Sequence, residues 1–166
     1  MAPSERFSQR RIGLTGGIAS GKSSLGHWLA QQGLPVLDAD QFAREALEPG
    51  LNATNTVLQR YGSKVQAEGA ATIDRAALGR IVFQDPAERL WLEQLIHPIV
   101  RDRFDQALTR HAETPAIVLM IPLLFEAGLE SLCSEIWLVD CDESQQLERL
   151  IARDGLSPTA AQARIA

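Results

Sequence analysis

The residue pattern with the most specific chemistry is Gly-x-x-x-x-Gly-Lys-Ser, which occupies residues 16–23. Glycine lets the backbone turn tightly, so that the N–H groups of such a loop point inward at bound phosphates. Lys22 is a mobile positive charge that can reach the β- and γ-phosphates of a nucleotide, and Ser23 offers a hydroxyl to Mg²⁺. The pattern predicts a phosphate-binding loop, or P-loop.

The segments on either side of this loop have the patterns of a strand and a helix. Residues 11–15 form a short, mostly apolar run, and residues 24–32 place apolar side chains at the spacing of one helix face. The alternative is a glycine-rich turn without a ligand. The chain has only two lysines, Lys22 and Lys64, so lysine abundance does not explain the match. We therefore favour phosphate binding.

Length and composition indicate one globular domain, with or without a small insertion. The chain has 166 residues, of which 45% are apolar and 22% charged. A net charge of −5 argues against a general affinity for nucleic acid, and no apolar run approaches the length of a membrane span. Cys133 and Cys141 are too few for a disulfide framework, so we expect small buried side chains in a reducing cytoplasm.

Alternating apolar runs and amphipathic stretches predict an α/β fold with a parallel sheet. We expect a nearly all-helical stretch between the second and third strands, with a helix start at Asp85-Pro86 and a break or new start at His97-Pro98. Ligands of such sheets bind outside the carboxyl ends of the strands, so the segments that follow the strands are expected to share one crevice. The further strands are expected at 35–37, 116–121 and 136–139.

Two carboxylates, Asp38 and Asp40, follow the second expected strand. One could accept the proton of an attacking hydroxyl, and the other could hold Mg²⁺ directly or through water. The alternative is that one of them caps the following helix. Beside a P-loop we favour a functional role for at least one, and the pattern leaves open which.

Arg149 and Arg153 lie four residues apart on one expected helix and therefore share a face. They could project toward the phosphates and stabilise the negative charge of the phosphoryl group during its transfer. The alternative is a solvated face paired with Glu148 or Asp154. We expect His97 to be structural or to shape a substrate site, because a general base is not required of it if an aspartate serves.

Taken in order, these segments resemble the dephospho-CoA kinase family, from about residue 10 to the end of the chain. A P-loop alone occurs in many families, whereas Asp38-Ala39-Asp40, His97-Pro98 and Pro122-Leu123-Leu124-Phe125-Glu126 in this order are far more selective. The other matching segments are Ala43-Arg44-Glu45, Ile81-Val82-Phe83, Leu92-Glu93 and Arg153-Asp154-Gly155-Leu156-Ser157.

The resemblance implies a three-layer P-loop NTPase fold with a parallel sheet, a helical insertion and a lid. The nucleotide-binding core would span about 10–48 and 112–148, the helical substrate-binding insertion about 49–111, and the lid about 149–166. Family members continue with the rest of the lid, a final strand and a helix, so the resemblance also implies a lid that extends past the printed sequence.

The resemblance further implies that ATP, with Mg²⁺, phosphorylates the 3′-hydroxyl of the ribose of dephospho-CoA, the last step of coenzyme A synthesis. Ala19 stands where many family members have glycine. The implied catalytic residues are Asp40, Lys22, Arg149 and Arg153, with Asp38, Asp40 and His97 at the substrate and Ser23 at the metal. The residues implied to hold ATP are Gly17, Ile18, Ala19, Ser20, Gly21, Lys22, Ser23 and Ser24.

Two other functions stay open at this level. One is another small-molecule P-loop kinase, such as a nucleoside monophosphate kinase, against which the Asp38-Ala39-Asp40 and His97-Pro98 segments argue. The other is a nucleotide-binding regulatory protein that hydrolyses slowly and needs no acceptor. No guanine-reading Asn-Lys-x-Asp motif is present to support it. We expect a small-molecule acceptor and neither a nucleic-acid nor a membrane partner.

Overall fold

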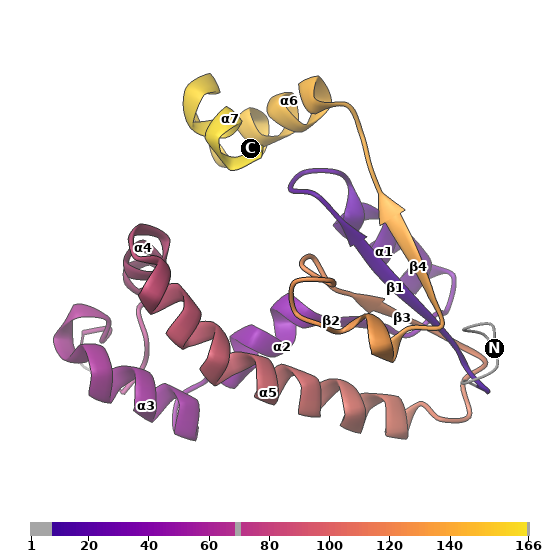
Figure 1. The fold of residues 1–166 in the computed structure, drawn as a ribbon, viewed down its shortest axis with the longest axis horizontal. Coiled ribbons are helices and arrows are strands. Elements are labelled where there is room, and N and C mark those ends of the chain that lie inside the picture. The colour runs from indigo at the N-terminus through magenta and orange to yellow at the C-terminus, as the bar shows by residue number, and fades with distance from the viewer. Residues whose placement is uncertain (1–7, 69–70, 166) are drawn as a thin grey trace. The chain divides into compact units, whose positions relative to one another are not determined.

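The computed structural model describes residues 8–68 and 71–165, and the chain divides into two compact units. The first combines residues up to Ala39 with those from Leu108 onward, and the second runs from Asp40 to Ala107. No helix among the described residues combines the length and the apolar character that a membrane span requires. The elements are β1 (Arg10–Gly16), α1 (Lys22–Gln31), β2 (Val36–Asp38), α2 (Ala39–Ala46), α3 (Asn52–Tyr61), η2 (Gly62–Lys64), α4 (Arg75–Gln84), α5 (Pro86–Arg110), β3 (Ala116–Met120), η3 (Glu130–Leu132), β4 (Glu135–Val139), α6 (Glu143–Asp154) and α7 (Pro158–Ile165) (Figure 1).

The first unit is built on a parallel sheet with the strand order β2-β3-β1-β4. β1 is central and pairs with β3 on one side and β4 on the other (Figure 1). Its last residue, Gly16, lies opposite Val139, the last residue of β4. The predicted α/β fold with a parallel sheet is confirmed.

The central strands form where the sequence is continuously apolar. Leu14 of β1 and the β3 residues Ile117, Val118 and Leu119 are fully buried. A strand that is covered on both faces has a continuous apolar sequence instead of alternating apolar and polar residues. These two strands could therefore be predicted from their apolar runs. β4 lies at the sheet edge in the described chain and alternates, with Ile136 and Leu138 exposed. The buried side chains hold the carboxyl end of β1 in the middle of the sheet.

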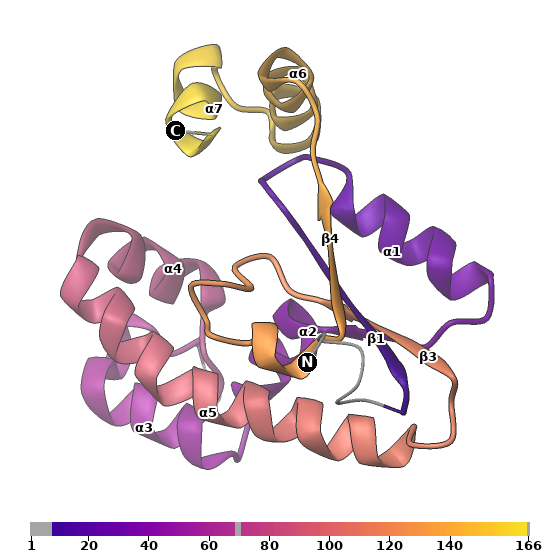
Figure 2. The same cartoon turned by 45° about the vertical axis from the view of Figure 1, so that its right-hand side comes forward.

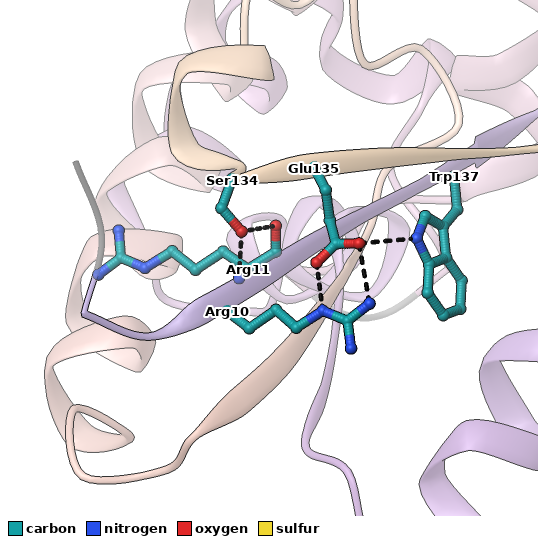
Figure 3. A network of polar contacts seen from close by, with 5 residues as sticks. All are labelled: Arg10, Arg11, Ser134, Glu135 and Trp137. Carbon is teal, nitrogen blue, oxygen red and sulfur yellow. Dashed lines mark hydrogen bonds and ion pairs between the residues drawn. The ribbon is translucent and has the colours of Figure 1, made fainter. Parts of the chain in front are cut away.

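A polar network fixes the register of β1 against β4 at the ends opposite the loop (Figure 3). The Arg10 guanidinium forms a two-bonded ion pair with the Glu135 carboxylate, which also accepts a bond of 3.0 Å from Trp137 Nε1. The bond to Arg10 holds the pKa of Glu135 below its usual value. The Ser134 hydroxyl accepts a bond of 2.8 Å from the Arg11 amide. Because Arg10 is largely exposed, the ion pair serves mainly to specify register.

The second unit is helical and has its own apolar core, formed by Val57, Val65 and Leu78. α3 lies beside α5 in both views (Figures 1 and 2), and a bidentate ion pair joins Arg60 to Glu88 across these helices at 2.8 Å for both bonds. The bond to Arg60 lowers the pKa of the Glu88 carboxyl to about 2. These contacts tie the first turn of α5 to the end of α3.

The start of α5 agrees with the prediction from sequence. Asp85 precedes Pro86, the first residue of the helix, and its Oδ1 accepts a bond of 2.8 Å from the Ala87 amide. This side chain satisfies an amide that has no partner within the helix, and proline at the first position needs none.

The predicted break at His97-Pro98 is wrong, because α5 continues through Pro98 to Arg110. Proline inside a helix costs about 3 kcal/mol through a lost hydrogen bond and a clash. Ile96, Val100 and Phe104, on both sides of the proline, are buried. Each buried apolar side chain of this size contributes about 1.5–3 kcal/mol. Burial along the helix therefore outweighs the local preference for a break.

The packing predicts opposite effects of alanine at two glycines. A Cβ at Gly13 in β1 would lie 2.6 Å from Cys133 Sγ and 2.9 Å from Leu124 Cδ1, so Gly13→Ala should lower the free energy of unfolding by about 1–3 kcal/mol. A Cβ at Gly79 in α4 would meet no atom of the described residues within 4 Å. Gly79→Ala should therefore stabilise the protein by about 0.5–1 kcal/mol. Urea unfolding followed by circular dichroism measures both, and changes of the same sign would contradict this packing.

Candidate active site

The loop between β1 and α1 turns where only glycine fits. A Cβ on Gly16 would lie 2.3 Å from the carbonyl oxygen of Val139 and 2.8 Å from Ser20 Oγ. Gly21 precedes α1 with a φ of 103°, a backbone conformation that favours glycine. The predicted sequence of strand, glycine-rich loop and helix is confirmed.

Ala19 also has a left-handed backbone, with a φ of 56°. Among the described residues no other non-glycine residue has a positive φ. This conformation costs a residue with a Cβ about 1–2 kcal/mol. Contacts with other parts of the chain must therefore offset this cost and hold the loop in its shape.

Side chains of α6 supply these contacts. Gln146 Nε2 donates to the carbonyl oxygen of Ile18 at 2.9 Å. Arg149 Nη1 donates to the carbonyl oxygens of Ala19 and Ser20, both at 3.1 Å. Three successive carbonyl groups of the loop thus point at one face of α6.

The two arginines predicted to act together have different partners. Arg149 contacts the P-loop, as described above. Arg153 is exposed and pairs with its neighbour Asp154, whose carboxylate also binds Arg164 at 3.3 Å. The Arg153 guanidinium holds the pKa of Asp154 below its usual value. The structure therefore brings Arg149 to the loop. Arg153 instead forms an ion pair with Asp154, as the alternative prediction of a solvated helix face expects.

Sequence reasoning missed Gln146 and misjudged Cys141. Gln146 precedes Arg149 by three residues, a spacing that puts both on one helix face and could have drawn attention to it. Cys141, expected to be buried, is half-buried, with Sγ 3.5 Å from Arg149 Nη1 and 3.9 Å from the Ala19 carbonyl oxygen. Cys133 is buried as expected, and burial raises the pKa of its thiol to about 11.

Ser20 carries a side-chain polar atom that has no hydrogen-bond partner in the described part of the chain. Its side chain is 5% exposed, and its Oγ makes no hydrogen bond among the described residues. A buried hydroxyl left unpaired costs about 1–3 kcal/mol. A ligand that brings acceptors into the loop would remove this cost. The loop thus fits a phosphate group in two ways. Its glycines leave space for the group, and the Ser20 hydroxyl, which has no partner among residues 8–68 and 71–165, can donate to it.

The first turn of α1 adds the charged part of the site. Lys22 begins the helix and is half-buried, and Ser23 and Ser24 follow it with exposed side chains. Amides of the first helical turn have no partner within the helix, and the helix dipole makes this end partially positive. Together they make this end of α1 suited to an anion.

The remaining predicted residues are divided between the two units. Asp38 ends β2 in the first unit and is half-buried, whereas Asp40 and His97 belong to the second unit and are exposed. The segment that starts at Pro122 is tied to the end of β1, because Thr15 Oγ1 donates to the Pro122 carbonyl oxygen at 3.0 Å. Within the first unit the structure brings together the P-loop, α6 and the end of β4.

Comparison with known proteins gives a consistent result. A family model for dephospho-CoA kinase matches residues 10–166. A dephospho-CoA kinase from Synechococcus sp. strain CC9605 is 86% identical over 166 residues, which cover this whole chain and 80% of that protein. One from Parasynechococcus marenigrum strain WH8102 is 62% identical and covers 95% of this chain and 78% of its own length.

Two solved structures resemble this chain. The crystal structure of TT1252 from Thermus thermophilus has a TM-score of 0.81 at 38% identity, covering 94% of this chain and 78% of that one. The dephospho-CoA kinase from Campylobacter jejuni has a TM-score of 0.66 at 29% identity, covering 93% and 78%.

Proposed function

Because this chain belongs to the dephospho-CoA kinase family, we propose that its P-loop binds ATP and that the γ-phosphoryl group passes to the 3′-hydroxyl of the ribose of dephospho-CoA. Family membership gives the chain dephospho-CoA kinase activity, the final step of coenzyme A biosynthesis. The observation that carries the site assignment is the glycine-lined turn in which the buried Ser20 hydroxyl has no partner among the described residues.

The phosphates of ATP would be held by backbone amides and one lysine. Residues 17–24 supply the amides of the loop and of the first turn of α1, and Lys22 supplies the charge. Ser20 Oγ would donate to a phosphate oxygen and so gain the partner that it lacks among the described residues. These groups attract the phosphates to one place in a chain whose net charge is −5.

Mg²⁺ would be held by the Ser23 hydroxyl together with phosphate oxygens. Magnesium usually binds few protein groups and keeps waters and substrate phosphates as its other ligands. Ser23 fits this requirement because it lies exposed in the first turn of α1, directly after Lys22. When bound, the ion neutralises charge that develops on the β- and γ-phosphate oxygens.

Asp40 would accept the proton of the attacking hydroxyl. The ribose 3′-oxygen forms the new bond to phosphorus, the bond from phosphorus to the bridging oxygen of ADP breaks, and the proton goes to the Asp40 carboxylate. Asp38, at the end of β2, would orient the acceptor beside it. Exposure of Asp40 in the first turn of α2 supports this role, because a hydroxyl can reach it.

The arginines would spread the charge of the transferring group. Arg149 uses Nη1 for two loop carbonyls, and a guanidinium has five N–H groups, so its other N–H groups can face phosphate. Arg153 would join it when the lid of residues 149–166 closes, exchanging its bond to Asp154 for one to phosphate.

The helical insertion of residues 49–111 would hold the acceptor, with the exposed His97 shaping its site. The partner is the small molecule dephospho-CoA. We further propose a cytoplasmic location, which is consistent with the two free cysteines, Cys133 and Cys141.

Acceptor dependence tests this function. With ATP and Mg²⁺ present, ADP release should be slow until dephospho-CoA is added. Nucleoside monophosphates should not replace it, because the acceptor of this family is dephospho-CoA. A coupled assay of ADP release measures the rates. The same rate with and without dephospho-CoA would contradict kinase chemistry and favour a nucleotide-hydrolysing regulatory protein, and a higher rate with a nucleoside monophosphate would reassign the acceptor.

Asparagine at the two aspartates separates their roles. Asp40→Asn removes the proposed proton acceptor and should lower kcat by about 10²–10⁴-fold with the KM for ATP retained. Asp38→Asn, two residues earlier, should mainly raise the KM for dephospho-CoA. Steady-state kinetics with each substrate varied in turn gives both values. If Asp38→Asn suffered the large loss in kcat and Asp40→Asn did not, the base would be Asp38.

A further inference from the structure

We propose that Gln146 is a positioning residue of the P-loop, which fixes the peptide unit between Ile18 and Ala19 so that the Ala19 amide points at the phosphates. The observation is the bond of 2.9 Å from Gln146 Nε2 to the Ile18 carbonyl oxygen. The proposal rests on the function above, in which the loop binds ATP. It adds to that site a residue of α6 that contacts the carbonyl side of the loop.

Peptide geometry links the carbonyl that Gln146 holds to an amide on the other side of the loop. A trans peptide unit is planar, and its C=O and N–H groups point in opposite directions. No cis peptide bond occurs in the described chain. When the Ile18 carbonyl faces α6, the Ala19 amide must therefore face away from α6. The bond from Arg149 to the Ser20 carbonyl orients the Gly21 amide in the same way. Amides that converge in this manner form an anion-binding concavity.

Ala19 is the residue that most needs this support. Its φ of 56° is one that residues with a Cβ rarely adopt. The peptide units on both sides of Ala19 are held by α6, through the carbonyl oxygens of Ile18 and of Ala19 itself. Without the bond from Gln146, the loop is free to turn the unit between Ile18 and Ala19 and to populate other backbone conformations. ATP would then bind only the fraction of molecules with the competent loop, and its apparent affinity would fall by that fraction.

Gly17 makes room for the Gln146 carboxamide. A Cβ at position 17 would lie 2.9 Å from Gln146 Nε2. Apart from the residues adjacent to Gly17, no other heavy atom of the described chain would lie within 4 Å of it. The described φ values give no positive angle for Gly17, so alanine there is not excluded by backbone conformation. Alanine at position 17 should therefore act by displacing the Gln146 side chain from the Ile18 carbonyl.

The neighbouring glutamine is a matched control. Gln145 has the same side chain on the same helix but is exposed, whereas Gln146 is half-buried against the loop. Gln146 is uncharged and binds a carbonyl oxygen, so its removal should act on the shape of the loop and not on the charge of the site.

The test measures kcat and both KM values for Gln146→Ala, Gln146→Met and Gln145→Ala. We expect both Gln146 variants to raise the KM for ATP about tenfold, the scale of one lost hydrogen bond, while the KM for dephospho-CoA and the thermal midpoint stay unchanged. Gln145→Ala should match the wild type. Methionine keeps the length of the side chain without the N–H donor, so recovery in Gln146→Met would assign only a packing role and overturn the proposal.

A double-mutant cycle that combines Gly17→Ala with Gln146→Ala tests whether alanine at position 17 acts through Gln146. Gly17→Ala alone should raise the KM for ATP about as much as Gln146→Ala, and the double variant should be no worse than either. Additive effects would show that alanine at position 17 acts directly on the phosphates and would overturn the link to Gln146.

Lys22→Ala separates failure of this proposal from failure of the proposed function. If Lys22→Ala raises the KM for ATP and the Gln146 variants do not, the role of Gln146 is wrong and the P-loop assignment stands. If Lys22→Ala also leaves the KM for ATP unchanged, the assignment of ATP to this loop is wrong, and the proposal that rests on it falls as well.

Discussion

The close approach of Gly16 to the carbonyl group of Val139 is the constraint on which the rest of the first unit depends. A Cβ there would lie 2.3 Å from the oxygen, so the chain can pass this point only as glycine. Parallel pairing of β1 with β4 creates the approach, and the ion pair of Arg10 with Glu135 fixes the register of that pairing at the far end of the strands. The turn at Gly16 therefore sets the position of the loop and of the first turn of α1, which begins with Lys22.

The loop that leaves this turn has two sides with different chemistry. Its outer side presents carbonyl oxygens, and uncharged Gln146 and charged Arg149 of α6 bind them. Its inner side presents amides and the Ser20 hydroxyl, which has no partner in the described chain. The strain at Ala19 and the unpaired hydroxyl are both unfavourable in the free protein, and a bound phosphate would relieve the second. A site built in this way is suited to an anion although the chain as a whole is acidic.

Local patterns made the fold predictable, and long-range contacts limited the prediction. The strands and the P-loop could be recognised because apolar runs and glycine spacing act within a few residues. The break expected at Pro98 was wrong because burial of Val100 and Phe104 outweighs the local cost of proline. Gln146 was missed because one glutamine has no signature of its own, and its partner Ile18 lies 128 residues away. The catalytic roles of Asp40, Arg149 and Arg153, and the division into core, insertion and lid, stay predictions.

In the proposed function, the inner amides of the P-loop bind the phosphates of ATP. Titration of ¹⁵N-labelled protein with ATP and Mg²⁺, followed by amide chemical shifts, measures this directly. The amides of Ala19, Gly21 and Lys22 should show the largest shifts, with one common saturation curve. Saturating ATP that left these three resonances unchanged, while amides elsewhere moved, would contradict the claim and place the nucleotide outside the loop.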